Sequence, residues 1–407
     1  MKIKNIVIKS LKCFKDLFID CLDENSKPYQ WTVLLGNNNS GKTSILKAIA
    51  NLSAKELPTI EQGKLNMADA DSKKFVPSVI FRSNEKLELS SDSYVGCSIS
   101  GIEDPNYVWR YNDKIVSLAD EKIKDFQIYG YGVSRYPSSA KLQDSTCEPC
   151  DTLFESDKKL INIEEWLMQL DYAAKNEQVK ASTRLNKIQK ILYGELFPEI
   201  YDFKVESTDE LHTYVKFKTK DGWFRYTQLG YGYQSMLSWV IDLCKRMFER
   251  YPDSENPLNE NAIVLVDEID LHLHPEWQRK VIPFLSKNFP NVQFIVTTHS
   301  PLVIQSMENI NLYVLHRNED TVIAERFPRN DFRGWTVEEI LRDVMHLEDD
   351  VHTDYYQEHY ASFENALDER DKNEAIKAFN ALEKLLHPNN PLRRILEIQI
   401  NQLKRND

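Results

Sequence analysis

Short apolar runs alternate with helical stretches along much of the chain, and this alternation predicts an α/β protein. Residues 31–35, 262–268 and 293–299 each contain a run of consecutive aliphatic or aromatic residues. Runs of this length and composition are typical of strands buried on both faces of a parallel sheet. The stretch 275–288 has helical spacing and lies between the second and third runs. Because strands that alternate with helices form parallel sheets, we expect an α/β sheet with flanking helices.

The remaining pattern predicts further elements of both kinds. Residues 3–8 and 126–133 have strand character, and residues 201–218 alternate between polar and apolar positions as a β-hairpin does. Apolar spacing predicts helices within 162–198 and over 234–250.

Two stretches stand apart from this pattern. Residues 52–125 are mixed and polar, and their pattern predicts no element. From about residue 335 the chain turns helical to its last residue.

Composition narrows the class of protein. A length of 407 residues suggests two or three domains, and the formal charge of −12 argues against broad nonspecific binding of DNA, while a local basic groove remains compatible with it. No apolar run approaches the 18 or more residues that span a bilayer, and the first ten residues do not resemble a signal peptide. Six cysteines without a secretory signal indicate reduced thiols, so we expect a cytoplasmic protein without a membrane partner.

The first candidate site is the run Gly36–Thr43, which fits the Walker A pattern G-x-x-x-x-G-K-[ST] between a predicted strand and a predicted helix. Its backbone N–H groups and the helix N-terminus would cradle phosphates, Lys42 would reach the β- and γ-phosphates, and the Thr43 hydroxyl would hold Mg²⁺. The alternative is a Gly/Asn surface turn. The predicted nucleotide-binding residues are Gly36, Asn37, Asn38, Asn39, Ser40, Gly41, Lys42, Thr43 and Ser44.

A second and a third motif follow the next two apolar runs. Asp267 and Glu268 end an aliphatic strand in a Walker B pattern, where Asp267 would orient Mg²⁺ and Glu268 would polarise the attacking water. His299 ends the following run, where it would hydrogen-bond the γ-phosphate or that water. We therefore predict Glu268, His299 and Lys42 as catalytic residues and Thr43 and Asp267 as metal ligands. A purely structural strand end is the alternative for each acid and for the histidine.

These motifs, in this order and spacing, resemble the ABC/SMC-type ATPase superfamily, and the resemblance covers the sheet-forming parts of residues 1–330. The string from Asp267 to Gln278 looks like the prokaryotic AAA-type branch that includes antiphage ATPases and OLD nucleases. In that branch a His-Pro pair begins the helix after Walker B, as His274 does here. His272 and His274 alternate as metal ligands can, but a shaped turn near a dimer interface is the favoured interpretation.

The superfamily also implies a signature loop that contacts the γ-phosphate bound to the opposite subunit. The segment Leu229–Ser235 resembles the L-S-x-G-x-Q/R pattern, with Gly230 where serine is usual. A glycine turn before a helix is the alternative. The resemblance implies nucleotide contacts from Gly230, Gly232, Gln234 and Ser235. It also suggests that Arg135, after a Y-G-x-x-R segment, faces the nucleotide or the partner subunit; an ordinary surface arginine is equally compatible with the pattern.

Three features of related proteins are missing or incomplete. Long heptads, which would form a coiled coil, do not occur between Thr43 and Leu229. Residues 331–407 are too short for a Toprim nuclease domain, and the acids Asp349 and Asp350 within them are best explained as a solvated acidic face. The pair Cys147 and Cys150 forms one C-x-x-C without a second pair, which favours a plain loop over zinc binding or a redox role.

The expected architecture is an ABC-type P-loop ATPase lobe, a mixed sheet with flanking helices, with a helical insertion and a C-terminal helical domain. We expect four segments: 1–155, the first part of the lobe with Walker A; 156–200, the insertion; 201–330, the second part with the signature-like loop, Walker B and His299; and 331–407, a domain that docks a partner.

The resemblance extends to the ATPase subunit of Septu-type and retron-associated Septu-like antiphage systems. It implies an ATP- and Mg²⁺-dependent ATPase that forms at least a homodimer around ATP and controls a separate effector nuclease of the HNH type. DNA or a retron RNA/DNA is a further candidate partner. A DNA-repair or DNA-end-sensing ATPase is the alternative, and the ATP-binding subunit of a transporter is disfavoured.

Overall fold

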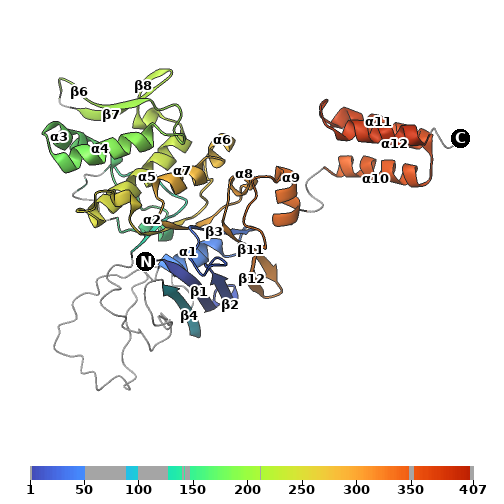
Figure 1. The fold of residues 1–407 in the computed structure, drawn as a ribbon, viewed down its shortest axis with the longest axis horizontal. Helices are drawn as coiled ribbons and strands as arrows, with labels where there is room; N and C mark the ends of the chain where they lie inside the picture. Colours follow the sequence, from blue (N-terminus) through green and yellow to red (C-terminus); the bar gives the residue numbers. More distant parts are fainter. Residues whose placement is uncertain are drawn as a thin grey trace. The chain divides into compact units, whose positions relative to one another are not determined.

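A computed structural model describes residues 2–50, 89–99, 127–139, 142, 147–210, 212–347 and 353–403. The chain forms two compact units, Met1–Val337 and Glu338–Asp407 (Figure 1). Most of the stretch 52–125 and the pair Asp349 and Asp350 lie outside the described residues.

A six-stranded mixed sheet forms the centre of the first unit. Its strand order is β12-β11-β3-β10-β9-β5, and all neighbouring strands are parallel except β11 and β12. The strands are β3 (Trp31–Gly36), β5 (Ile128–Tyr131), β9 (Ile263–Val266), β10 (Gln293–Thr297), β11 (Asn311–Asn318) and β12 (Thr321–Arg326). Every residue of β5, β9 and β10 is buried, as their continuous apolar runs predict. The predicted mixed sheet with flanking helices is therefore confirmed.

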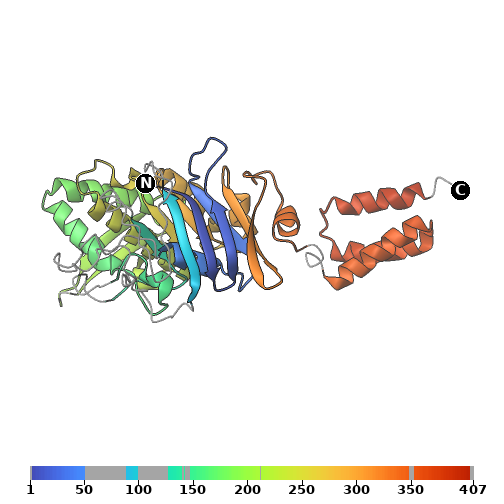
Figure 2. The same ribbon diagram turned by 90° about the horizontal axis from the view of Figure 1, so that it is seen from below.

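A smaller antiparallel sheet packs over one helix onto this central sheet. It consists of β1 (Ile3–Leu11), β2 (Phe14–Asp20) and β4 (Leu89–Ile99), which Figure 2 shows side by side. Helix α1 (Lys42–Ala50) shares one hydrophobic core with both sheets. The buried Gln293 joins the sheets directly, because its side-chain amide bonds both the N–H and the carbonyl of Ile3, at 2.7 and 2.9 Å.

Further helices and a third sheet complete the first unit. Helix α5 (Tyr231–Arg250) is the longest of the described helices, and the pair α3 (Ile163–Lys175) and α4 (Val179–Leu192) packs against it. The hairpin predicted at 201–218 is extended to three strands in the order β6-β7-β8. These strands are β6 (Asp202–Ser207), β7 (Thr213–Thr219) and β8 (Gly222–Arg225).

The single helix predicted at 275–288 is wrong, because the chain forms two helices there. They are α6 (Pro275–Gln278) and α7 (Val281–Asn288). Proline has no N–H and is tolerated only in the first turn of a helix, so Pro283 forces a new helix to begin just before it. His274 caps α6, with its Nδ1 accepting a hydrogen bond from the Glu276 N–H at 3.4 Å, and Pro275 occupies the first helical position.

The second unit is helical, as the sequence predicts. Helices α10 (Asp354–Asp368), α11 (Lys372–Leu385) and α12 (Leu392–Gln402) enclose a core that includes Phe363, Leu382 and Leu396. Among the helices in the described ranges, none combines the length and apolar character that crossing a bilayer requires.

Candidate functional site

The phosphate-loop candidate joins the end of β3 to the start of α1. Gly36 and Gly41 have φ angles of 154° and 86°. A Cβ on Gly36 would lie 2.6 Å from the Leu315 carbonyl oxygen, and a Cβ on Gly41 would lie 2.5 Å from the Phe14 ring. Only glycine fits such a close approach. Asn39 also has a positive φ of 63°, and turns that contain such residues direct backbone N–H groups toward an anion.

Lys42 lies folded over this loop. Its Nζ donates hydrogen bonds to the carbonyl oxygens of Gly36 and Asn37, at 2.7 and 2.9 Å. Burial lowers the pKa of Lys42, and the nearby charges of Asp267 and Glu268 act in the opposite direction. The ammonium group is thus held at the mouth of the loop by weak neutral acceptors, which phosphate oxygens can replace.

The first metal-ligand candidates meet across two elements. The Thr43 hydroxyl, on the first turn of α1, donates a hydrogen bond of 2.7 Å to Oδ2 of Asp267, which follows β9. Adjacent oxygen ligands of an octahedral Mg²⁺ lie about 2.9 Å apart when each bond is about 2.05 Å long. The two oxygens therefore have the chemistry and nearly the separation of neighbouring Mg²⁺ ligands.

Asp267 is also the residue that connects the strand ends. Its Oδ1 accepts a hydrogen bond of 2.7 Å from Thr297 at the end of β10, and its N–H donates to the carbonyl oxygen of Tyr131 at the end of β5, at 2.8 Å. The side chain is buried, with only 3% of the residue exposed. One carboxylate thus fixes α1, β9 and β10 relative to one another.

Glu268 occupies a strained turn immediately after this hub. Its φ is 48°, in the left-handed region that non-glycine residues rarely adopt, and its N–H donates a hydrogen bond of 2.7 Å to the Thr297 hydroxyl. Residues held in such conformations cluster at functional sites because the surrounding structure must enforce them. The enforced turn sets the direction in which the Glu268 side chain leaves the backbone.

The side chain of Arg135 holds the backbone of that turn in place. Its Nη2 donates hydrogen bonds to the carbonyl oxygens of Asp267 and Glu268, at 2.9 and 2.5 Å. The residue is 1% exposed, so the interpretation as an ordinary surface arginine is wrong. Burial lowers the pKa of Arg135 to about 10, against the opposing charges of Asp267, Asp270 and Glu268, and the guanidinium stays protonated at neutral pH.

His299 follows β10 and is anchored through its backbone. Its N–H lies 3.4 Å from Oδ1 of Asp270, which also accepts a hydrogen bond of 2.5 Å from the Thr298 hydroxyl. Ser300 then caps the short helix α8 (Pro301–Gln305). His299 is therefore presented at the same sheet edge as Asp267, on the neighbouring strand.

The signature-like segment forms the N-terminus of α5. Gly230 is the N-cap residue with φ −59°, and a Cβ there would have no neighbour within 4 Å. A Cβ on Gly232 would lie 2.6 Å from the His272 carbonyl oxygen, so α5 begins in close contact with the turn after Walker B. The Gln234 amide donates a hydrogen bond of 2.7 Å to the Leu229 carbonyl oxygen, and Ser235 is buried. Of the four residues, only Gly230 presents open backbone.

The histidine and cysteine candidates for metal binding or redox chemistry have surroundings that indicate a structural role. His272 has φ 64° and lies in the turn before α6, and no group of three or more His, Cys, Asp or Glu side chains within the described ranges is placed to hold a metal. Cys150 is buried, with its Sγ 3.4 Å from the Ile128 carbonyl oxygen. Burial raises the pKa of the Cys147 thiol to about 12, so this thiol is protonated and unreactive at neutral pH.

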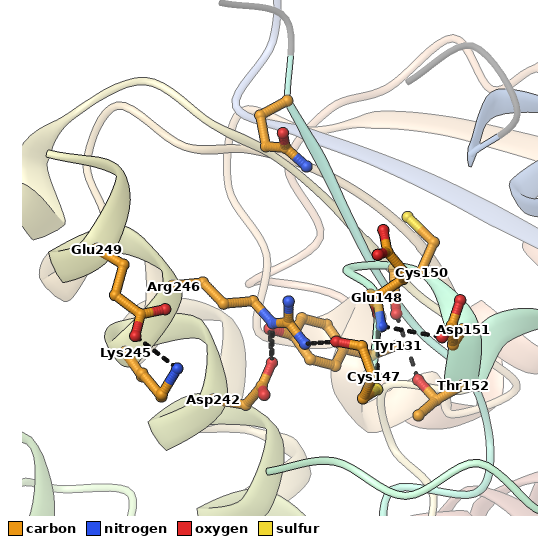
Figure 3. A network of polar contacts seen from close by, with 12 residues as sticks. Tyr131, Cys147, Glu148, Cys150, Asp151, Thr152, Asp242, Lys245, Arg246 and Glu249 are labelled. Atoms are coloured by element: carbon orange, nitrogen blue, oxygen red, sulfur yellow. Dashed lines mark hydrogen bonds and ion pairs between the residues drawn. The ribbon is translucent and has the colours of Figure 1, made fainter. Parts of the chain in front are cut away.

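A buried network of polar contacts that the motifs did not indicate connects α5 to β5 (Figure 3). Oδ2 of Asp242 accepts hydrogen bonds from Nε of Arg246 and from the Tyr131 hydroxyl, at 2.6 and 2.9 Å. Nη2 of Arg246 donates to the Cys147 carbonyl oxygen at 3.2 Å. The helix of the signature-like segment is thus joined to the strand whose carbonyl holds Asp267. Removing one partner would leave a buried charge uncompensated.

Two family models match the chain. An AAA ATPase domain model matches residues 1–129, and an AAA domain model whose description names an AbiEii toxin of a type IV toxin–antitoxin system matches residues 161–305. These ranges contain the Walker A run and the signature-like and Walker B segments, respectively.

Curated relatives carry the names of defence systems. The chain is 36% identical over 192 residues to a Septu protein PtuA of Bacillus thuringiensis, covering 46% of this chain and 48% of the relative. It is 39% identical over 132 residues to a probable ATPase of retron Ec83 of Escherichia coli, covering 32% and 24%. A second Septu protein PtuA, from Bacillus mycoides, is 26% identical over 83% of this chain and 44% of the relative. The resemblance to ABC/SMC-like AAA ATPases of prokaryotic defence systems is therefore confirmed.

The chain spans about half the length, or less, of these curated relatives. Among solved structures, an SMC head bound to the C-terminal winged-helix domain of ScpA is 15% identical with a TM-score of 0.45, covering 80% of this chain and 98% of that one. The fold class rests on the strand order and on the placement of the motifs.

The two glycines of the signature-like segment differ in their surroundings and allow a matched comparison. We expect Gly232→Ser to destabilise the first unit by about 1–3 kcal/mol, because its Cβ would collide with the His272 carbonyl oxygen. Gly230→Ser should leave stability unchanged or slightly higher, because serine is a preferred N-cap residue and the space is open. Thermal unfolding measures both; equal melting temperatures would contradict the close contact between α5 and the Walker B turn.

Arg135 should act on turnover more than on nucleotide affinity, because it holds the Glu268 backbone rather than the phosphate loop. We expect Arg135→Met to lower the ATP turnover rate about 10- to 100-fold, the size of effect that a misplaced catalytic group produces. ATP affinity, measured by calorimetry, should change less than about threefold. Arg135→Lys should restore part of the rate. A loss of melting temperature with unchanged turnover would reduce Arg135 to a purely structural role.

Proposed function

We propose that this chain, which resembles the ABC/SMC-like ATPases of prokaryotic defence systems, binds and hydrolyses ATP between two copies of itself. The observation that carries the proposal is the meeting of Lys42, Thr43 and Asp267 at one sheet edge, with the Thr43 hydroxyl 2.7 Å from the Asp267 carboxylate. A surface turn that only imitated the Walker A pattern would not require this pairing across 224 residues of chain.

The residues of this edge divide the chemistry among themselves. Lys42 would exchange its two carbonyl acceptors for phosphate oxygens, and Thr43 and Asp267 would hold Mg²⁺, which neutralises charge on the phosphates. Glu268 would accept a proton from the attacking water, with its position set by Arg135. His299 would donate a hydrogen bond to the γ-phosphate or to that water.

A second copy would complete the site with its signature-like segment. The open backbone at Gly230 and the N-terminus of a 20-residue helix behind it suit an incoming phosphate. Tyr231 supports a subunit interface at this place, because it is 65% exposed and its ring lies 6.3 Å from that of Tyr136, which is 40% exposed. Exposed tyrosines are enriched in protein–protein interfaces.

ATP-dependent closure of such a pair would control a separate effector nuclease, of the HNH type, that recognises the closed state. The names of the Septu and retron relatives support a role in antiphage defence. The helical segment 331–407 would dock the effector. Its helix α12 has a second apolar side, since Leu396 and Ile400 are buried while Ile395 and Ile398 are 51% and 57% exposed. Exposed apolar side chains arranged along one helix are typical of docking surfaces.

The shared site predicts how two substitutions differ. Glu268→Gln keeps the nucleotide-binding residues but loses the base, so ATP should accumulate and shift the chain toward a larger assembly in sedimentation velocity. Lys42→Ala should lose ATP binding and show no shift, because the ammonium group that contacts the phosphates is gone. Wild-type affinity for ATP in Lys42→Ala, measured by calorimetry, would refute the assignment of the phosphate loop.

Docking through α12 predicts a loss of association without a loss of fold. The double variant Ile395→Asp/Ile398→Asp should keep the helical content and melting temperature of the wild type, because both side chains are exposed. It should weaken association with an HNH nuclease encoded beside this gene by at least about tenfold, as loss of a buried apolar anchor does. The single variant Leu396→Asp should instead unfold the second unit. Unchanged nuclease binding by the double variant would exclude this helix as the docking surface.

A further inference from the structure

The sheet β6-β7-β8 has two faces of opposite character. Its inner face is apolar, with Phe203, Val215 and Phe217 buried. Strand alternation and the pairing of Lys216 with Arg225 and of Lys218 with Trp223 place a different set of side chains on the other face. We call this set the outer face of the sheet: Asp202, Lys204, Glu206, Tyr214, Lys216, Lys218, Trp223 and Arg225.

Cations and aromatic rings are interleaved on the outer face. The ammonium groups of Lys204 and Lys218 lie 4.6 and 5.9 Å from the centre of the Trp223 ring. The Tyr214 ring is likewise bracketed by the ammonium group of Lys216 and the guanidinium group of Arg225, at 5.3 and 3.9 Å from its centre. Significant cation–π contacts occur about once per 70–80 residues in proteins, so four within one small sheet are a concentration.

The charge of the outer face also departs from that of the chain. Four cations face two acids there, whereas the whole chain carries a formal charge of −12. Glu206 pairs with Lys216 and Lys204, at 2.6 and 3.4 Å, and so neutralises only part of the set. The outer face is therefore a locally basic surface on an acidic protein.

We propose that the outer face binds single-stranded nucleic acid, RNA or DNA. Bases would stack on Trp223 and Tyr214, and phosphates would pair with the lysines and the arginine that now cover those rings. Proteins that bind single strands without sequence preference combine these two elements, a cationic track and aromatic stacking platforms.

Replacing the cations over the two rings by stacked bases is favourable in free energy when typical values for the two contacts are compared. An exposed cation–π contact is worth a factor of about 2 to 5 in an equilibrium, whereas a base stacked on an aromatic ring contributes a factor of about 5 to 150. A lysine displaced from Trp223 does not lose its electrostatic partner, because the phosphate next to the stacked base replaces the ring. Each cation and each ring therefore has a role in the bound state.

The chemistry of the outer face selects single strands over other polyanions. In a duplex the bases are stacked on one another and cannot reach Trp223, and an acidic protein has no base to stack. With four cations against two acids, the outer face is more favourable for phosphate than the average of a chain with a formal charge of −12. The outer face shares no residue with the ATP site, so its binding of a strand can be measured without ATP.

Fluorescence anisotropy of the full chain with a labelled, mixed-sequence single strand of about 12 nucleotides tests the proposal, using DNA and RNA in turn without ATP. We expect Trp223→Ala to weaken binding about tenfold or more and Trp223→Phe to change it less than about threefold, because phenylalanine keeps a stacking ring. The double variant Lys204→Ala/Lys218→Ala should reduce the slope of log affinity against log salt by about 1.4, or 0.7 for each phosphate contact.

The double variant Lys27→Ala/Lys377→Ala is the matched control, because it removes the same charge from exposed positions outside this sheet and should keep the wild-type slope. Melting curves show whether each variant is folded. If Trp223→Ala does not fold, the salt dependence of Lys204→Ala/Lys218→Ala still tests the proposal. Wild-type affinity in both outer-face variants would overturn the proposal. So would equal affinity for a duplex or for poly-glutamate, which would show attraction of charge without base stacking.

Discussion

The active arrangement depends on one buried carboxylate. Asp267 accepts hydrogen bonds from Thr43 on α1 and Thr297 on β10, and its backbone is bonded to Tyr131 and Arg135 near β5. A carboxylate this deeply buried is stable only when its oxygens are fully bonded, so the elements that supply the donors are held in register with it. The phosphate loop, the strained turn at Glu268 and the end of β10 are consequently fixed as one rigid group before any nucleotide arrives.

Much of the sheet edge that carries these motifs could be predicted from the sequence, because its strands have recognisable local patterns. β3, β9 and β10 are short strands rich in apolar residues, and Gly36, Asp267 and His299 stand at or just after their ends. Fully buried parallel strands have this pattern wherever they occur. The meeting of Thr43 with Asp267 then follows from the rule that parallel strands present their carboxyl ends at one edge.

Other features depended on partners far along the chain. β2 and β12 are short and partly exposed, and they contact each other although they lie at opposite ends of the first unit's sequence. The burial of Arg135 is a consequence of acids and carbonyl groups about 130 residues later, which no local pattern records. The break in the helix at 275–288 had a local signal, Pro283, whose consequence is clear once its missing N–H is considered.

The proposed nucleic-acid face and the signature-like segment are adjacent in sequence. β8 ends at Arg225 and α5 begins at Tyr231, with a single 3-10 turn at Tyr226–Gln228 between them. The Tyr226 hydroxyl contacts the Ser238 hydroxyl at 2.6 Å and donates to the Gln234 carbonyl oxygen at 2.7 Å, so the turn is packed firmly onto α5. A strand bound to the outer face would thus act next to the surface that meets a second subunit, and a nucleic-acid signal and ATP would influence the same helix.

The central claim is that each ATP site is shared by two copies of the chain, and subunit mixing tests it most directly. Lys42→Ala removes the phosphate-loop cation, whereas Gly230→Glu places a negative charge in the open space where the phosphate of the opposite subunit would bind. Each variant alone should be inactive. An equimolar mixture should recover up to about a quarter of the wild-type ATPase rate, because half of the random dimers then contain one intact site of two. Full activity of Gly230→Glu alone, or no recovery in a mixture shown to exchange subunits, would contradict a shared site.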